Sequence, residues 1–172
     1  MNRFHVHLHV RDIEESVKFY TPFFGKQPTK RKPDYAKWML DDPYVNFAIT
    51  TEPGHVGLSH LGIQVDDGQT LTHVSNRART TSGELLVERG AHCGYAVGDK
   101  TWANDPQGVR WESFHTYTNE MPDFGCGAEQ TWRENARGER QIVSPPSCGA
   151  TANAQTPQAT KGRATTREEI SP

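Results

Sequence analysis

Between Phe4 and Val10, apolar residues alternate strictly with histidines. A period of two is typical of a β-strand, because successive side chains point to opposite faces of the sheet. His5, His7 and His9 therefore share one face, while the other face is apolar and suited to packing. The pattern predicts a sheet whose histidine face looks into a polar or metal-bearing cleft. The alternative is a solvated face that carries histidines by coincidence.

This register recurs once further along the chain. Residues 59–67 repeat residues 4–12, so that His60 falls on His5 at an offset of 55 residues. A duplicated unit of this length is the signature of two structural copies built on one plan. Each copy therefore opens with a strand that carries a histidine at the same place.

The ends of the two copies also correspond. An Asp-Pro pair comes shortly before Val45 in the first copy and before Val109 in the second. Counting on from these valines, Ala48 corresponds to Glu112. The second copy thus has a carboxylate on its closing strand, where the first has a side chain that cannot bind a metal.

Local signals predict the same order of elements in both copies, namely a strand, a helix and three strands. In the first copy Asp12 can cap a helix that Gly25 ends. We expect an α+β fold whose folded domain spans residues 1–122, with modules at 1–52 and 57–118. The other expected strands are 27–31, 35–40, 45–51, 84–88, 100–103 and 109–116, with a second helix at 69–82 and a loop containing Cys93 at 90–98.

The pattern changes after residue 122. From Asp123 to Pro172, Gly, Ala, Thr, Gln and Pro dominate the sequence. Such a composition buries too little apolar area to offset the loss of chain entropy on folding. We expect residues 123–172 to form a mostly disordered tail, of which Trp132 could dock a short piece.

Charge and cysteine content narrow the function classes. The net charge is −2 over 172 residues, which gives no general basic field, so neither nucleic acid nor an anionic membrane is the expected partner. No apolar run is long enough to span a bilayer and no signal-peptide pattern opens the chain, so a cytoplasmic protein is expected. Three cysteines without a secretion signal argue against a disulfide framework and leave thiols for redox or metal chemistry.

Two copies of strand, helix and three strands, each opening with a histidine, resemble the vicinal oxygen chelate superfamily. That superfamily includes glyoxalase I, extradiol dioxygenases and bleomycin-resistance proteins. The resemblance implies that paired βαβββ modules form a cupped half-barrel with a divalent metal inside. Matched residue by residue, it implies that His5, His60 and Glu112 are the metal ligands and that Ala48 occupies the fourth position.

This donor set also makes chemical sense by itself. Two imidazoles and one carboxylate form the facial triad of non-haem Fe(II) oxygenases. Fe(II) is therefore the expected metal, and Zn(II), Ni(II) and Mn(II) are alternatives that suit the same ligands. We expect His7 and His9 to support the ligands or line the cleft. His7 is the main rival of His5, because neighbouring histidines on one strand face can both reach a metal.

Three segments carry a closer resemblance, namely Cys93–Trp102, Asp105–Glu112 and Arg31–Ala36. Over about residues 1–125 the chain is similar to the branch that contains the ArsI carbon–arsenic lyases and the cadmium-induced CadI proteins. The resemblance implies an enzyme for arsenic detoxification. It would use Fe(II) and dioxygen to split the carbon–arsenic bond of trivalent organoarsenicals, with the arsenic held by two adjacent cysteines in the loop before the seventh strand.

The chain departs from that pattern at the second cysteine. Cys93 is followed by Gly94, and one thiolate is a weak clamp for As(III), a soft ion that prefers two or three sulfurs. Cys126 or Cys148 could supply another thiol, and Cys126, near the end of the expected domain, is the better candidate. Otherwise Cys93 is an ordinary loop cysteine. The alternatives to the lyase are a CadI-like heavy-metal-binding protein and a glyoxalase or bleomycin-resistance relative with another small ligand, and a homodimer is left open.

Overall fold

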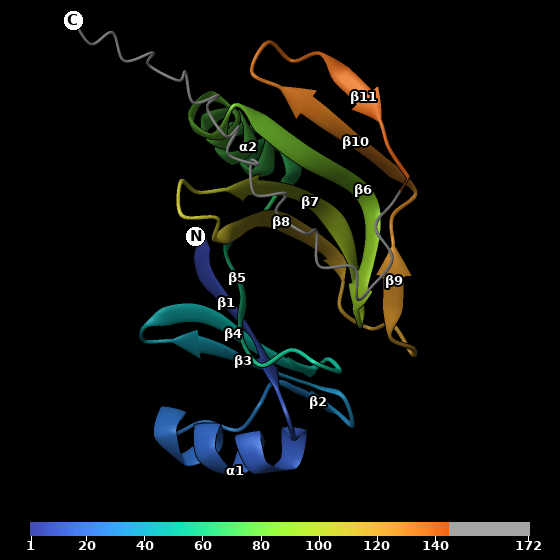
Figure 1. Ribbon diagram of the computed structural model, residues 1–172. Helices are drawn as coiled ribbons and strands as arrows, with labels where there is room; N and C mark the ends of the chain where they lie inside the picture. The colour runs from blue at the N-terminus through green and yellow to red at the C-terminus, as the bar shows by residue number, and fades with distance from the viewer. Residues whose placement is uncertain (145–172) are drawn as a thin grey trace, which may run out of the picture.

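A computed structural model describes residues 1–144. One curved mixed sheet of eleven strands runs through them, in the order β11-β10-β6-β7-β8-β5-β1-β4-β3-β2, with β9 paired to β6. Figure 1 shows helix α1 beneath the first module and α2 beside the second, with β1 and β5 meeting between them. The fold is α+β, as expected. None of the helices in residues 1–144 is long and apolar enough to cross a membrane.

The elements of the first module follow the expected order. They are β1 (Arg3–Val10), α1 (Ile13–Phe24), β2 (Lys30–Lys32), β3 (Tyr35–Asp41) and β4 (Tyr44–Thr51). Those of the second are β5 (Gly57–Gln64), α2 (Gly68–Ser82), β6 (Glu84–Gly94), β7 (Ala96–Asn104) and β8 (Arg110–Thr118). Three further strands follow, β9 (Gly125–Gly127), β10 (Gln130–Asn135) and β11 (Arg140–Ile142).

Strand pairing confirms the internal repeat. β1 runs parallel to β4, and β5 runs parallel to β8 in the same way. The two modules meet where β1 and β5 pair antiparallel. Because β1 and β5 are the opening strands of the two copies, their histidines come together at the centre of the curved sheet.

The helix ends follow the repeat as well. Asp12 caps α1 by accepting a hydrogen bond from the Glu15 amide at 2.7 Å, and Asp67 caps α2 by accepting one from the Thr70 amide at the same distance. An aspartate at this position satisfies amides that the first turn leaves unpaired. The buried faces of α1 and α2 cover the sheet on the side away from the histidines.

The apolar faces form separate clusters under each helix. Beneath α1 the completely buried Trp38 and Ile49 pack with Ile13 and Val17. Beneath α2 a smaller cluster contains Leu71, Val74 and Val65. Each module therefore has its own core, and the opposite face of the sheet is left for polar side chains.

The expectation of a mostly disordered segment from residue 123 is wrong for residues 125–142. Strand β10 pairs antiparallel with β6, and Trp132, only 7% exposed, packs with Leu85 and Val87. An added strand covers the hydrogen-bonding groups that the edge of β6 would otherwise leave open. The average composition of the segment did not indicate this short strand. The expectation that Trp132 could dock a short piece of the segment is confirmed. Residues 145–172 lie outside the described part of the chain.

The expected loop at 90–98 is also wrong. β6 and β7 continue through most of it as a hairpin, in which Cys93 pairs with Ala96. Gly94 makes the reversal possible because its φ of +59° is in the left-handed region that favours glycine. Cys93 therefore lies on a strand, which fixes its backbone more firmly than a loop would.

Candidate metal centre

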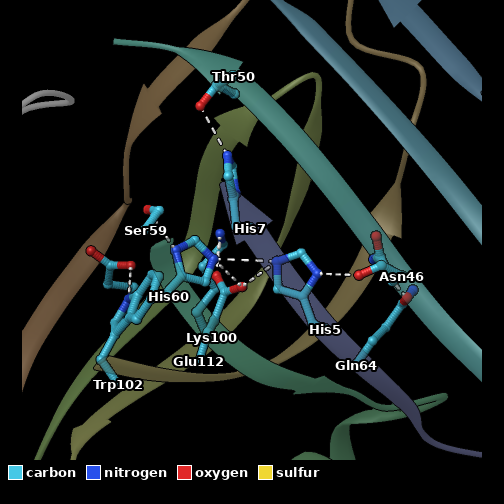
Figure 2. Close-up of polar contacts among 11 residues, drawn as sticks. His5, His7, Asn46, Thr50, Ser59, His60, Gln64, Lys100, Trp102 and Glu112 are labelled. Carbon is cyan, nitrogen blue, oxygen red and sulfur yellow. Dashed lines mark hydrogen bonds and ion pairs between the residues drawn. The ribbon is translucent and has the colours of Figure 1, made fainter. Parts of the chain in front are cut away.

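Three side chains from three strands converge on one point inside the cup (Figure 2). His5 Nε2 and His60 Nε2 are 3.2 Å apart. Glu112 Oε2 lies 3.4 Å from His60 Nε2 and 3.7 Å from His5 Nε2. The three residues are 8% exposed or less. Residues far apart in the sequence are thus brought together, as the resemblance implied.

Backbone register explains the convergence. Across β1, β5 and β8, His5 pairs with Gly62, and Gly62 pairs with Glu112. Paired residues on neighbouring strands point to the same face. His60, two residues before Gly62, also points to this face because side chains alternate along a strand. Gly62 has no side chain, so the space between the two strands is open to the three donors.

Gly62 is also required by packing. A Cβ atom at this position would collide with the carbonyl oxygen of Glu112. The glycine therefore lets β5 and β8 approach closely, in addition to leaving room above the strands. This links the geometry of the candidate site directly to one residue type in β5.

A hydrogen bond orients each imidazole. His5 Nδ1 is 3.0 Å from the carbonyl oxygen of Asn46, which can only accept, so Nδ1 carries the proton and Nε2 presents a lone pair in the neutral ring. His60 Nδ1 lies 3.0 Å from Ser59 Oγ. Such partners on the remote nitrogen are the usual means by which a protein orients a metal-binding histidine.

The imidazole of His5 stays neutral at physiological pH. Burial lowers its pKa to about 4, even though the nearby Glu112 carboxylate opposes that shift. Neutral imidazole is the form that binds a metal ion. His5 therefore has the correct protonation state for a ligand without any change on binding.

Lys100 holds the carboxylate from the other side. Its Nζ donates to Glu112 Oε1 at 2.6 Å, leaving Oε2 directed at the two imidazoles. Burial would raise the pKa of Glu112, but Lys100 and the two histidines together hold it well below its ordinary value. Glu112 is thus ionised in a buried site, which agrees with the role of an anionic ligand.

These atoms fit a divalent cation. A point equidistant from three atoms with these separations lies about 2 Å from each, the usual bond length from such an ion to imidazole nitrogen or carboxylate oxygen. The donor set of two nitrogens and one oxygen suits Fe(II), Zn(II) and similar ions.

His7 and His9 lie on the same face as His5. One nitrogen each of His5, His7 and His60 lies within 4.8 Å of the others. His7 Nε2 is 2.9 Å and His9 Nδ1 is 3.1 Å from Thr50 Oγ1. His9 turns outward, where its Nε2 lies 3.0 Å from Glu52 Oε2. His7 therefore borders the centre, and His9 lines the rim of the cup.

Cys93 is a free, exposed cysteine that interacts with Lys100. Burial alone would lower the pKa of Lys100, but its interactions with Cys93 and with the Glu112 carboxylate raise it above its ordinary value. One ammonium group thus connects the cysteine to the metal centre. Cys126 lies directly opposite Cys93 in the pairing of β9 with β6, so two cysteines distant in sequence stand on adjacent strands. Cys148 lies outside the described part of the chain.

Lys100 and Trp102 were not predicted to belong to the site. Both side chains lie on the face of Glu112, since Trp102 pairs with Glu112 and Lys100 is two residues away in β7. The Trp102 ring meets the His60 ring edge to face at 5.0 Å, and its Nε1 donates to Glu88 Oε2 at 2.8 Å. Both residues lie in the segment Cys93–Trp102 that carries the closer resemblance, which is a signal that could have pointed to them.

Comparison with known proteins supports the expected branch. The chain is 39% identical over 119 residues to the trivalent organoarsenical cleaving enzyme of Bacillus sp. (strain MD1), covering 66% of this chain and 73% of that protein. It is 36% identical over 130 residues to the cadmium-induced protein CadI of Mycobacterium tuberculosis (strain ATCC 25618 / H37Rv), covering 74% of this chain and 84% of that protein. The resemblance to the ArsI/CadI branch is confirmed.

A solved structure shows the same fold. An extradiol ring-cleaving dioxygenase from B. fuscum aligns with a TM-score of 0.52 at 16% identity, covering 66% of this chain and 32% of that chain. Residues 3–113 match the family described as the Glyoxalase/Bleomycin resistance protein/Dioxygenase superfamily. With its paired modules and its donor atoms gathered inside the cup, the chain belongs to the glyoxalase/bleomycin resistance protein/dioxygenase superfamily.

Proposed function

We propose that this protein is an Fe(II)-dependent enzyme that uses dioxygen to cleave the carbon–arsenic bond of trivalent organoarsenicals. The observation that carries the proposal is the convergence of His5 Nε2, His60 Nε2 and Glu112 Oε2 within 3.7 Å of one another. This donor set suits non-haem Fe(II). The similarity to relatives named organoarsenical cleaving enzymes supports the reaction class.

In this proposal His5, His60 and Glu112 hold the metal ion. The ion, when bound, would supply the site at which dioxygen is activated, and Ala48, which pairs with His7, provides no donor to it. Lys100 keeps one carboxylate oxygen occupied, so that Glu112 offers the other oxygen to the ion. Trp102 and Phe114 pack against the two imidazoles and limit the access of water.

Cys93 is the residue proposed to hold the arsenic. A thiolate is the preferred donor for a soft ion, and Cys93 interacts with Lys100, the residue that also donates to Glu112. In the reduced protein Cys126 is the proposed second sulfur, because the two residues are directly paired across β6 and β9. This cross-strand arrangement would take the place of two adjacent cysteines, which Gly94 rules out.

A second candidate function is the binding of a heavy-metal ion without turnover. Gly94 favours it, because a capture site that lacks the adjacent thiol is less suited to hold an arsenical during a reaction. The similarity to CadI, named as a cadmium-induced protein, points in the same direction. Cd(II) would then bind to the thiols and imidazoles of the same cup.

Turnover separates the two functions. Reduced protein is loaded with Fe(II) under anaerobic conditions, mixed with trivalent methylarsenical, and exposed to dioxygen, while oxygen uptake and inorganic arsenite are measured. The lyase predicts both signals in wild type and neither in Glu112→Gln. Stoichiometric retention of the arsenical or of Cd(II), with no arsenite released, would support the binding protein and overturn the lyase. Absence of any arsenical binding would favour another small ligand.

A further inference from the structure

The pseudo-symmetry of the two modules is broken at one row of residues. In the second module Gly62 on β5 stands beside Glu112 on β8. The equivalent pair in the first module is His7 on β1 beside Ala48 on β4. The second module therefore has its large polar side chain, Glu112, on the closing strand. The first module has its own, His7, on the opening strand. His7 stands next to the position where Ala48 offers no donor.

The His7 ring lies next to the rings of His5 and His60. It is the direct pairing partner of His60 across β1 and β5, and the centres of the two rings are 4.8 Å apart. One nitrogen of His7 lies within 4.8 Å of a nitrogen of His5 and of His60. Ligand atoms on opposite sides of one ion stand about 4 Å apart, so the separation of these nitrogens is close to that of ligands sharing one ion.

A contact with Thr50 also anchors the ring of His7. Its Nε2 lies 2.9 Å from Oγ1 of the buried Thr50. When Nε2–H donates to this oxygen, Nδ1 carries the lone pair of the neutral ring. The contact corresponds to that of His5 with Asn46 and of His60 with Ser59. All three imidazoles of the centre thus have one nitrogen anchored to the protein.

We propose that His7 is a fourth protein donor to the metal ion, supplied from β1 in place of the ligand that Ala48 lacks. The inference rests on the proposed metal centre of His5, His60 and Glu112. Three imidazoles and one carboxylate favour the nitrogen-binding ions Fe(II), Co(II), Ni(II) and Zn(II) over Mn(II) and Mg(II), which prefer oxygen. His7 thereby determines both the affinity of the site and its choice among divalent ions.

His9 provides a matched control for His7. The two residues share one strand face, and both contact Thr50 Oγ1. Of the two, His7 alone belongs with His5 and His60 to the group whose ligand atoms lie within 4.8 Å of one another. Loss of the Thr50 contact is therefore common to His7→Ala and His9→Ala, whereas loss of a metal donor is specific to His7→Ala.

The test is a Co(II) and Zn(II) titration of metal-free wild type, His7→Ala, His9→Ala and Glu112→Ala, combined with X-ray absorption counting of the bound imidazoles. We expect wild type to bind one ion with three imidazoles. His7→Ala should bind with two imidazoles and on the order of 100-fold weaker, while His9→Ala should stay within about tenfold of wild type. His7→Gln, of similar size, replaces His7→Ala if circular dichroism shows that the alanine variant is unfolded.

Two failures can be distinguished. If His7→Ala or His7→Gln binds with unchanged affinity while Glu112→Ala loses the ion, the centre is correct and His7 is not a donor. A count of two imidazoles in wild type would overturn the inference in the same way. If Glu112→Ala also keeps the ion unchanged, the proposed centre itself is wrong.

Discussion

Lys100 and Glu112 form a buried ion pair in which Lys100 engages one of the two carboxylate oxygens. The ammonium group lies 2.6 Å from Glu112 Oε1, and Oε2 faces two imidazole nitrogens instead. A buried pair of this kind is costly to break, because the remaining charge loses its partner without gaining water. The ion pair therefore fixes the position of the carboxylate and also contributes to the stability of the sheet.

Two substitutions of Glu112 should distinguish its role in metal binding from its role in folding stability. Glu112→Gln keeps an oxygen that can accept from Lys100 but loses the anionic donor. We expect metal affinity to fall by on the order of 100-fold or more, since ligand loss exceeds the effect of losing an outer partner. Glu112→Ala should in addition destabilise the metal-free protein, by about 3 kcal/mol or more, because Lys100 is left unpaired. Urea unfolding of both metal-free variants measures the difference, and equal midpoints would contradict it.

Gly62 should tolerate no side chain. Gly62→Ala places a Cβ against the Glu112 carbonyl oxygen, so β5 and β8 must separate. We expect a loss of about 1–3 kcal/mol in the free energy of unfolding, together with weaker metal binding. Gly68→Ala is the control, because its Cβ meets open space at the start of α2 and should change stability by about 1 kcal/mol or less. Similar effects at both positions would argue against the close approach of the strands.

The segment after residue 122 should contribute to stability. Trp132 packs on Leu85 and Val87, so Trp132→Ala should cost about 3–5 kcal/mol. Ile142→Ala, at a residue that is 78% exposed, should cost about 0.5 kcal/mol or less. Deletion of residues 130–172, which composition alone suggests is harmless, is now expected to lower the melting temperature sharply. Thermal unfolding of the three variants checks this, and an unchanged melting temperature for Trp132→Ala would contradict the observed packing.

Introducing a cysteine at position 94 should lower the stability of the fold. The new Cβ would have ordinary contacts of 3.7 Å and longer with Tyr35 and Phe124, so space is available. The φ of +59° is nevertheless unfavourable to any side chain, by about 1–2 kcal/mol. We therefore expect Gly94→Cys to bind trivalent methylarsenical more tightly but to be less stable, and Cys93→Ser to lose binding. Titration and thermal unfolding measure both, with Cys126→Ser in parallel. Wild-type affinity in Cys93→Ser would remove Cys93 from the proposed capture site.

Lys37 should make stability depend on pH above neutrality. Burial, with Lys30 nearby, lowers the pKa of Lys37 to about 8, while the unfolded chain keeps an ordinary value near 10.5. Between these values the unfolded chain binds more protons than the folded one, so stability rises as the pH rises from about 8 to 10.5. Below pH 8 the charged Lys37 destabilises the fold, and Lys37→Met should stabilise it by on the order of 1–3 kcal/mol at pH 7.

Urea unfolding between pH 7 and pH 10 tests this effect. Wild type should gain stability over that range relative to Lys37→Met, which should show a smaller slope. Lys18→Met changes an exposed lysine of α1 and should follow wild type. Parallel curves for wild type and Lys37→Met would show that Lys37 titrates normally in the folded state.

The repeat was the most informative part of the sequence. The offset between His5 and His60 predicted the pairing of two modules, and the alternation around His5 predicted the face that carries the polar residues. Asp12 predicted the start of the first helix. These features are local or periodic, so they can be read without knowledge of distant contacts.

Other features depend on contacts that no local pattern contains. Trp132 lies in a polar, low-complexity context, and its strand is stabilised by the open edge of β6. The anchoring of Glu112 by Lys100 depends on the register of β7 against β8. Likewise, Cys93 and Cys126 stand opposite each other on neighbouring strands because β9 pairs with β6. Each of these is a tertiary relationship between segments that composition treats separately.

The proposed metal centre requires His5, His60 and Glu112 to share one divalent ion. A crystal of the Co(II)-loaded protein, with diffraction recorded at the cobalt absorption edge, would locate that ion. We predict one anomalous peak per chain, at about 2.0–2.2 Å from His5 Nε2, His60 Nε2 and Glu112 Oε2. A peak at another cluster, such as His9 with Glu52, or no peak between these three atoms at full loading, would show that they do not share an ion.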